Sequence, residues 1–435
     1  MIFRFQAYTY ALAAVTFILI LVVGGCGPEP ERASSAVQIT VWAHAGQESE
    51  RNQLLDQVSR FNQIHPELEI QLTLIPEGSY NAQIQAAAVA QTLPDLLELD
   101  GPFLSGYAWQ GHLLPLDDLL SQSLLNDLLP SIVAQGRYAE RLWSVGVFDS
   151  GLGLYADVTK LHQADVRIPT LQHPWSGEEF ETVLQRLSEL DPDGQVLDLK
   201  LNYAGEWYTY GFLPLIVSAG GDLIDRHSMQ SAEGVLNGPE SFALIKRLQH
   251  WILNRQVDPN IDDAAFTLGR VPLALGGHWN YQRYHESLGD ALLLLPLPDF
   301  GTGSKTGQGS WCWAISANTQ QAKKAASFLT YLLQTEEVLA MTNANSAVPA
   351  TRSAIALSPL YRNGGPLHLF VEQLEGGYAV PRPRTPAYPV ITAEFQRIID
   401  GIRSGGKIQP RLDRAAKVID REIADNRGYP WVGKQ

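Results

Sequence analysis

The residues of this chain that are able to do chemistry are acids, histidines and cysteines, and they form no catalytic or metal-binding pattern. The sequence contains no H-E-x-x-H, no G-x-S-x-G and no cysteine pair with metal-ligand spacing. Gly303-Ser304-Lys305-Thr306 matches only part of a phosphate-binding loop, because the upstream glycine is missing. These absences predict a protein without catalytic residues, metal or cofactor.

Two acids occupy positions where a carboxylate would be useful. Asp100 ends an apolar segment, and Asp149 lies six residues before Tyr155. Two carboxyl groups about 5 to 9.5 Å apart would form the catalytic pair of a glycoside hydrolase. Either carboxylate would equally well accept hydrogen bonds from the hydroxyl groups of a bound polyol. The spacing in sequence does not choose between these roles, and both stay open at this point.

Cys26 has the most specific surroundings of any reactive residue. Arg4 precedes an apolar run, residues 11–23, that is shorter than a membrane-spanning helix and is typical of an export signal. Val23-Gly24-Gly25-Cys26 resembles a bacterial lipobox, in which the cysteine thiol is joined to lipid. We predict a signal peptide over residues 1–25 and a lipid-anchored tether over residues 26–36, with an uncleaved membrane anchor as the alternative. The expected location is the cell membrane, facing the periplasm or the cell exterior.

The composition limits the partners and the architecture. The formal net charge is -14, which argues against nucleic acid as a partner because that partner calls for a basic face. Cys312 is the only other cysteine, so acylation of Cys26 would leave no intramolecular disulfide. A chain of 435 residues with 45% apolar content can bury a large core and is expected to form two lobes.

Alternating strand and helix patterns predict an α/β fold. Alternation of apolar and polar residues indicates strands, and apolar residues at helical spacing indicate helices. The order strand, helix, strand, helix, strand implies a parallel sheet covered by helices, with ligands at the carboxyl ends of the strands. The predicted strands are 38–42, 68–74, 93–100, 291–295 and 313–315, and the predicted helices are 54–64, 80–90, 242–252 and 322–333.

Six segments carry a family resemblance when they are taken together. They are Ile39-Thr40-Val41-Trp42; Leu93-Pro94-Asp95; Val145-Gly146 followed by Gly153-Leu154-Tyr155; Ser218-Ala219-Gly220-Gly221-Asp222; Gly269-Arg270 followed by Gly276-Gly277-His278-Trp279; and Ala347-Val348-Pro349-Ala350-Thr351-Arg352. In this order and behind a lipobox, the chain resembles the sugar-binding subunits of ATP-driven (ABC) importers, the family that contains maltose-binding protein. The resemblance covers nearly the whole mature chain.

The resemblance implies the two-lobed periplasmic-binding-protein fold. Each lobe would be a mainly parallel sheet flanked by helices, with the ligand cleft between the lobes. The chain would cross between the lobes near Phe148, Ala314 and Asn363. Lobe 1 would comprise residues 37–147 plus 315–362, and lobe 2 would comprise residues 148–314 plus 363–435.

The resemblance also implies a set of ligand-binding residues. Asp100 and Asp149 would accept hydrogen bonds from sugar hydroxyls, and Trp279 would stack on the apolar face of a sugar ring. The loop after the first strand would contribute His44, Gln47 and Glu48. An aromatic group before Ser218 would contribute Trp207, Tyr208 and Tyr210. The remaining expected positions are His278, Trp311 and Arg352.

Each of these positions has a structural alternative. The loop residues would be solvated, Asp100 would cap a helix, aromatic residues such as Tyr210 would belong to the core, and Arg352 would pair with an acid. Trp313 is expected in the core because it alternates with Trp311 along one strand. Phe395 stands where relatives have a tryptophan, which argues against a long maltodextrin because phenylalanine donates no hydrogen bond.

The function that the resemblance implies is extracytoplasmic capture of a small carbohydrate by a protein that is not an enzyme. The protein would deliver this ligand to the transmembrane permease subunits of an ABC importer, as a monomer without a cofactor. The ligand would be an oligosaccharide or a glycoside such as glucosylglycerol, trehalose or sucrose. Two alternatives stay open: an extracellular glycoside hydrolase or lyase, and a binding protein for a non-sugar solute.

Overall fold

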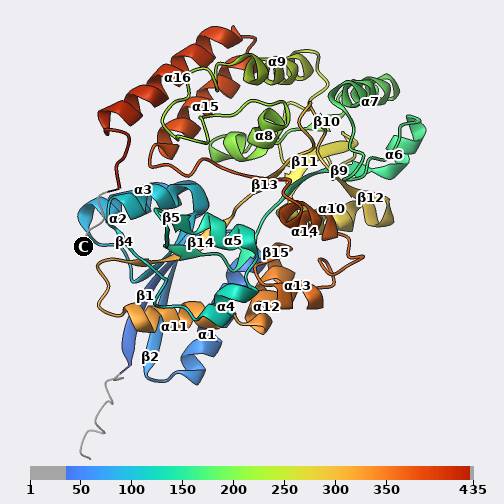
Figure 1. The fold of residues 1–435 in the computed structure, drawn as a ribbon. Helices are drawn as coiled ribbons and strands as arrows, with labels where there is room; N and C mark the ends of the chain where they lie inside the picture. The colour runs from blue at the N-terminus through green and yellow to red at the C-terminus, as the bar shows by residue number, and fades with distance from the viewer. Residues whose placement is uncertain (1–35, 432–435) are drawn as a thin grey trace, which may run out of the picture. The chain divides into compact units, whose positions relative to one another are not determined.

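The computed structural model describes residues 36–431 (Figure 1). The chain divides into two units, Met1–Ala36 and Val37–Gln435, and the second contains the helices and strands given below. The predicted signal peptide and the lipobox with Cys26 lie outside the described residues. Across residues 36–431, no helix combines the length and the apolar character that crossing a bilayer requires.

The first sheet has six strands in the order β2, β1, β3, β14, β4, with β7 paired to β14. β1 is parallel to β2 and β3, whereas β14 is antiparallel to β3, β4 and β7. Trp311 of β14 lies opposite Asp100 of β3. The bounds are β1 (Val37–Ala45), β2 (Leu68–Pro76), β3 (Leu96–Asp100), β4 (Leu113–Leu114), β7 (Ser144–Val145) and β14 (Trp311–Ser316).

Successive residues of this sheet pack on opposite faces, as the pleat requires. Leu96 and Ile315 belong to one core cluster, while Leu97 and Ala314 belong to another. The first cluster is covered by α1, α11 and α12, and the second by α2 and α3. We call the elements around this sheet lobe 1. Its helices and short strands are α1 (Glu48–Ile64), α2 (Glu77–Ala90), η1 (Gly101–Phe103), α3 (Leu104–Trp109), α4 (Gln122–Asp127), α5 (Pro130–Gln135), β5 (Arg137–Tyr138), β6 (Arg141–Leu142), α11 (Ala322–Leu332), α12 (Thr335–Asn345), α13 (Arg352–Leu357) and α14 (His368–Glu375).

The second sheet has four strands in the order β10, β11, β9, β12. β10 is parallel to β11, but β9 is antiparallel to both β11 and β12. β9 is thus the one strand of this sheet that runs against the others, as β14 is in the first sheet, and most strands in each lobe share one direction, as expected. The bounds are β9 (Leu152–Asp157), β10 (Leu197–Asp198), β11 (Leu273–Gly277) and β12 (Leu292–Leu295).

A large core cluster and a smaller one, which includes Tyr155 and Ala274, pack on the second sheet, and we call these elements lobe 2. α8 lies inside the large cluster, and eleven of its thirteen residues are buried. Figure 1 shows α15 and α16 side by side over α8 and α9. The helices are α6 (Val158–Gln163), α7 (Gly177–Leu190), α8 (Glu206–Ser218), α9 (Pro239–Leu253), η2 (His278–Asn280), α10 (Tyr281–Leu288), η3 (Gly289–Ala291), α15 (Tyr388–Arg403) and α16 (Ile408–Asp425).

Two short ladders accompany the passages of the chain between the lobes. β8 (Phe148–Asp149) pairs with β15 (Val348–Pro349), and β13 (Thr306–Gln308) pairs with β16 (Ala379–Pro381). The residues that follow the predicted crossing at Asn363 still pack in lobe 1, since Phe370 belongs to its core. The lobe limits expected from the sequence stay a prediction.

The chain returns to lobe 1 after α16. Trp431 contacts the rings of Tyr138 and Trp143, with centroids 5.6 and 5.5 Å away. The Trp109 indole N–H donates to the carbonyl of Pro430 at 3.0 Å, and the Trp109 ring lies 5.0 Å from that of Tyr429. We call residues 429–431 the C-terminal strap; Figure 1 shows it leaving α16 and approaching α3.

Candidate functional site

Arg382 occupies the centre of the candidate site, just after β16. Its guanidinium forms a two-point ion pair with Asp100 at the end of β3, with distances of 2.6 and 3.0 Å, and a third hydrogen bond of 2.8 Å to Glu206. It also lies over the Tyr210 ring at 4.9 Å from the centroid, a favourable cation–π geometry. Burial would lower the pKa of Arg382, but these carboxylates raise it. A permanently charged side chain therefore joins an acid of lobe 1 to one of lobe 2.

Glu206 begins α8 and receives three donors. Besides Arg382, it accepts the hydroxyl of Thr392 at 2.7 Å and a hydrogen bond from the hydroxyl of Tyr388. Burial raises the pKa of Glu206, although Arg382 acts in the opposite direction. The acid is thus fixed in place by α15 and by the segment before it.

Asp149 is a second buried carboxylate, in the crossing strand β8. Its Oδ1 accepts the backbone N–H groups of Ser150 at 2.7 Å and Gly309 at 3.1 Å. Its Oδ2 makes no hydrogen bond of normal geometry in the part of the chain described, although the Ser131 hydroxyl is near enough to lower the pKa of this acid. Burial is the larger effect and raises the pKa of Asp149. Oδ2 is thus a buried acceptor whose near neighbour is the Ser131 hydroxyl.

Two of the predicted aromatic residues, Trp207 and Trp279, meet beside Tyr210 and Arg382. The ring of Trp279 lies 6.2 Å from that of Tyr210 and 6.1 Å from that of Trp207. Gly277 makes this arrangement possible, because a Cβ at that position would lie 2.1 Å from Cζ3 of Trp279. The expected close approach of the glycine backbone is therefore present. Flat rings placed in this way offer the surface on which an apolar sugar face can stack.

His278 lies between Trp279 and the Asp149 region. One ring nitrogen, Nδ1, is 3.0 Å from the hydroxyl of Ser150. Burial lowers the pKa of His278 to about 3, so its imidazole is neutral at pH 7. A neutral imidazole both donates and accepts hydrogen bonds without adding charge to the site.

His44 and Trp311 stack with ring centroids 3.9 Å apart and an angle of 6° between the planes. The His44 Nδ1 atom is 2.8 Å from Glu98, which also accepts the His44 backbone N–H at 3.0 Å. Burial would lower the pKa of His44, but Glu98, with help from Glu50 and Glu77, raises it to about 9. His44 is therefore a cation held against an indole ring.

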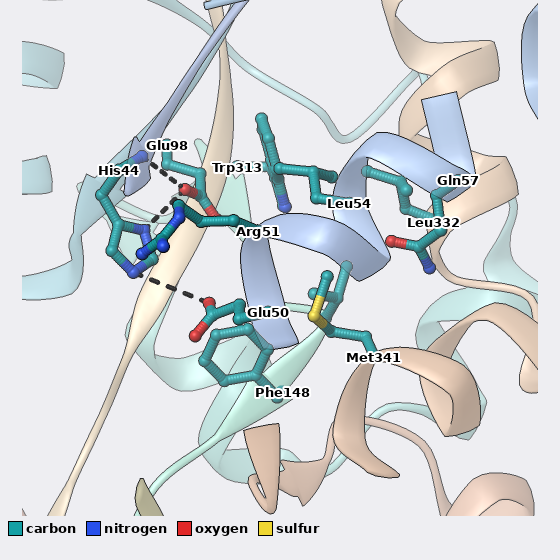
Figure 2. A pocket seen from close by; sticks show the side chains of 11 residues that line it. His44, Glu50, Arg51, Leu54, Gln57, Glu98, Phe148, Trp313, Leu332 and Met341 are labelled. Atoms are coloured by element: carbon teal, nitrogen blue, oxygen red, sulfur yellow. Dashed lines mark hydrogen bonds and ion pairs between the residues drawn. The ribbon is translucent and has the colours of Figure 1, made fainter. Parts of the chain in front are cut away.

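A small cavity of about 10 Å³, with room for about one water molecule, lies next to His44 (Figure 2). Glu50 of α1 and Phe148 of β8 line it, and Figure 2 shows the Glu50 carboxylate directed at the second nitrogen of His44, at 3.6 Å. Burial raises the pKa of Glu50 to about 7, against the lowering effect of His44. The cavity thus lies between the loop after β1 and the strand that carries Asp149.

Three predicted ligand residues lie apart from this group. The Gln47 amide donates to the Asn345 carbonyl at 3.2 Å, and Glu48 is exposed as the first residue of α1. Arg352 is exposed and donates to the carbonyls of Asn126 and Leu128 at 3.2 and 3.0 Å. The structure gives these residues structural partners, and their role toward a ligand stays a prediction.

Tyr208 points away from its neighbours Trp207 and Tyr210, because successive residues of a helix face different directions. Its hydroxyl donates to the Leu201 carbonyl at 3.0 Å and accepts from Arg403 at 2.6 Å. Trp313 is buried in the lobe 1 core, as expected from its alternation with Trp311. Phe395 is fully buried in the lobe 2 core, so its identity gives no argument about the length of a ligand.

Sequence reasoning missed Arg382, Glu206 and Gln135. Gln135 closes the same region, because its side chain donates to the Ser310 carbonyl at 2.6 Å and accepts the Ser310 N–H at 3.1 Å. Glu206 had a usable signal, since it is the only charged residue of an otherwise apolar and aromatic helix. Arg382 stands between Pro381 and Pro383, a weak signal that gives no hint of its partners.

A second small cavity, of about 20 Å³, lies beside Arg382. It is lined from lobe 1 and from the crossing strands by Gly101, Pro102, Gln135, Gln308, Gly309, Pro381, Arg382 and Arg384. No group of three or more histidines, cysteines and acids suitable for a metal ion occurs in residues 36–431. The site combines polar groups with aromatic rings at the meeting of the two lobes.

Comparison with protein families places most of this chain within one of them. The sequence profile described as bacterial extracellular solute-binding protein matches residues 56–364. A relative from Streptomyces antibioticus, an uncharacterized lipoprotein in the oleD 5′ region, is 23% identical over 362 residues, which cover 80% of this chain and 77% of the relative.

Solved structures share the fold at low sequence identity. The GacH receptor of Streptomyces glaucescens superimposes with a TM-score of 0.77 at 20% identity, covering 90% of this chain and 99% of the receptor. The cyclic α-maltosyl-1,6-maltose binding protein of Arthrobacter globiformis gives 0.74 at 21% identity, covering 90% and 100%. The sugar-binding protein MalE of Xanthomonas citri gives 0.74 at 18% identity, covering 90% and 98%. These likenesses show the two-lobed α/β fold of maltose-binding proteins.

Proposed function

The chain belongs to the family of bacterial extracellular solute-binding proteins, and from that premise we propose that it captures a small carbohydrate for an ABC importer. Its partners are the permease subunits and, through lipid on Cys26, the outer face of the cell membrane. The protein acts as a monomer and carries out no covalent chemistry. Sugar binding shifts the population toward the arrangement of the lobes that binds the sugar more tightly. The permease recognises that arrangement.

One observation carries the choice of a carbohydrate: unpartnered polar atoms lie next to flat rings. The Asp149 Oδ2, the Tyr210 hydroxyl and the Arg382 Nε are buried and make no hydrogen bond of normal geometry with the described residues. Buried polar groups are nearly always paired, so each calls for an explanation. An acceptor, a hydroxyl and a donor suit the hydroxyl groups of a sugar, while Trp279 covers its apolar face.

The relatives favour an oligosaccharide within this class. One neighbour was solved in complex with acarbose and another binds cyclic α-maltosyl-1,6-maltose. Smaller glycosides such as glucosylglycerol, trehalose and sucrose stay candidates, because the same polar atoms would serve a ligand of one or two rings. An anionic solute is disfavoured, since Asp100, Asp149 and Glu206 outnumber the one guanidinium among them.

A thermal-shift screen of the mature protein against saccharides tests the proposal. A ligand at 100 times its Kd adds about 2.7 kcal/mol to the free energy of unfolding, which raises Tm measurably. The best saccharide is then titrated calorimetrically into the wild type, into Trp279→Ala and into Leu268→Ala as an exposed control in the same lobe. We expect Trp279→Ala to weaken binding at least about tenfold, equivalent to about 1.4 kcal/mol, and the control to bind normally.

Two results would contradict the proposal. The first is the absence of any stabilisation by mono-, di- or oligosaccharides, together with stabilisation by a polyamine, iron or phosphate. The second is the appearance of shorter sugars after incubation, because turnover would identify a glycoside hydrolase or lyase. Chromatography of the incubated saccharides distinguishes capture from cleavage.

A further inference from the structure

Tyr203 continues the aromatic group of the candidate site toward the surface. Its ring lies 5.6 Å from that of Trp207, which in turn lies 6.1 Å from Trp279, and Trp279 lies 6.2 Å from Tyr210. We call these four residues the aromatic row. Tyr210 and Trp207 are buried, whereas 36% of Tyr203 is exposed. The row therefore leads from Arg382 in the interior to an accessible ring.

The exposed ring is held in one orientation. The Tyr203 hydroxyl donates to Asp263 Oδ2 at 3.0 Å and lies 3.4 Å from a nitrogen of Arg283. Asp263 also accepts from Lys200 at 2.9 Å, and the Lys200 side chain is fully buried. Tyr203 is thus the outer member of a charged network whose other members are anchored in lobe 2.

Holding the Tyr203 ring in one orientation costs conformational entropy, and the contacts of the ring within the fold do not fully offset that cost. Ordering a partly exposed side chain removes conformational freedom, and hydrogen bonds at the surface return little. The cost is offset when the ordered ring forms a binding surface, because a ligand then does not have to order it. Tyrosine suits this purpose, since it presents a large apolar face with few rotatable bonds.

The same network also reaches the inner part of the row. Arg283 donates to Asn280, which follows Trp279 in η2, and to Asp263 at 2.5 Å. The same set of ion pairs thus holds both Tyr203 and Asn280, the residue next to Trp279. A ligand that contacts both rings would find them already fixed relative to each other.

We propose that Tyr203 is an outer stacking position of the ligand site and that it selects saccharides with at least one ring more than the inner site accommodates. This inference rests on the proposed carbohydrate function. Rings of one saccharide would lie along the aromatic row, with the terminal ring on Tyr203. Short saccharides would bind through the inner residues alone.

The test compares affinities along ladders of saccharides from one to four rings, one ladder of α-1,4-linked and one of β-1,4-linked glucose. Calorimetric titrations use the wild type, Tyr203→Ala, Tyr203→Phe and the exposed control Ile261→Ala. We expect the Tyr203→Ala substitution to weaken binding of the longest members at least about fivefold and of the shortest members less than about twofold. Tyr203→Phe, which keeps the ring, should retain most of the length preference, and Ile261→Ala should retain all of it.

The results of these titrations distinguish a failure of the Tyr203 inference from a failure of the proposed carbohydrate function. If Tyr203→Ala weakens every length equally while Tm falls, Tyr203 only supports the fold and the inference is wrong. If wild-type affinity does not rise with length, there is no outer position and the inference is again wrong, although sugar binding stands. If the wild type binds no saccharide, the proposed function fails and the inference fails with it.

Discussion

Arg382 and Asp100 form a buried ion pair between residues 282 positions apart in the chain, with nitrogen–oxygen distances of 2.6 and 3.0 Å. Asp100 ends a strand of lobe 1, and Arg382 follows the ladder that leads into α15 of lobe 2. Because Glu206 of α8 shares the same guanidinium, one cation neutralises acids from both lobes. The pair therefore belongs both to the stability of the fold and to the ligand site.

Replacing Arg382 by alanine should destabilise the protein strongly. Arg382→Ala leaves Asp100 and Glu206, with 12% and 24% of their side chains exposed, without their cation. Removing one partner of a buried pair costs about 3–5 kcal/mol, because the remaining charge stays buried. Urea denaturation of the purified variant measures the loss.

The matched control is Arg141→Ala. Arg141 pairs with Asp117 at 2.9 Å, but 47% and 31% of the two side chains are exposed. An exposed pair contributes about 0–1 kcal/mol, so this variant should unfold close to the wild type. Equal losses in the free energy of unfolding of the two variants would show that burial does not make the Arg382 pair more stabilising than an exposed pair.

Glu50 and His44 should each lower the free energy of unfolding as pH rises, whereas His278, whose pKa is lowered to about 3, acts in the opposite direction below pH 6.5. The net free energy of unfolding should therefore fall as pH rises from about 7 to 9. The pKa of Glu50 is raised from 4.5 to about 7 and that of His44 from 6.5 to about 9. Both groups bind protons more tightly in the folded state, so their contribution is complete below the unfolded pKa and is lost as pH passes the folded pKa. Each tenfold gain in proton affinity corresponds to about 1.4 kcal/mol. Urea denaturation at pH 5, 7 and 9 measures the change.

Glu50→Gln separates the two groups. Glu98, Glu77 and Arg51 surround the same imidazole and stay in place in this variant. The Glu50 contribution between pH 4.5 and 7 should disappear, and the decline between pH 7 and 9, which belongs to His44, should persist. The control is Glu67→Gln, an acid whose side chain is 66% exposed. A wild type whose stability rises between pH 7 and 9 would contradict the assignment.

Asp149→Asn should weaken saccharide binding while the fold is retained. The amide would place an N–H donor where the Oδ2 atom now offers an acceptor, and hydrogen bonds to a charged group contribute about 1.5–3 kcal/mol. We expect a loss of affinity of about 10- to 150-fold in calorimetric titrations. The control Asp157→Asn changes an acid that caps α6, where its side chain accepts the Thr159 N–H. Unchanged affinity in Asp149→Asn would remove this residue from the site.

Tyr208→Phe should lower stability and leave binding unchanged. The variant loses the hydroxyl that bonds Leu201 and Arg403, at a cost of about 1 kcal/mol. Its neighbour Trp207 belongs both to the aromatic row and to the lobe 2 core, so Trp207→Ala should weaken saccharide binding and also lower stability, by about 3–5 kcal/mol. Denaturation and titration of both variants give the comparison. A clear loss of affinity in Tyr208→Phe would place its ring at the ligand.

Local patterns predicted most elements of the fold, because they depend on periodicity. The helix expected over residues 322–333 is α11, and the strand expected over 313–315 lies within β14. The direction of β9 could not be predicted, since strand polarity depends on how the chain passes between lobes. The apolar strand expected over 291–295 is β12, but three of its leucines are only half-buried because it lies at a sheet edge.

The candidate site could be predicted only in part. Trp279 was accessible to prediction because two glycines precede it, and close packing needs such neighbours. Arg382 was not accessible, because its partners are distant in sequence and no local pattern encodes an ion pair of that span. Tyr208 was expected beside Trp207 from the family resemblance, and its role toward a ligand stays a prediction; its hydroxyl bonds Leu201 because a helix turns adjacent side chains apart.

The C-terminal strap has a consequence for spectroscopy. Of the ten tryptophans, Trp109, Trp143 and Trp431 lie where the strap meets lobe 1. Any rearrangement of lobe 2 that shifts the strap would change their emission, even though no sugar touches them. A fluorescence titration of this protein would thus record lobe movement and ring stacking as one signal. Repeating the titration with the Trp431→Phe variant would separate the two contributions.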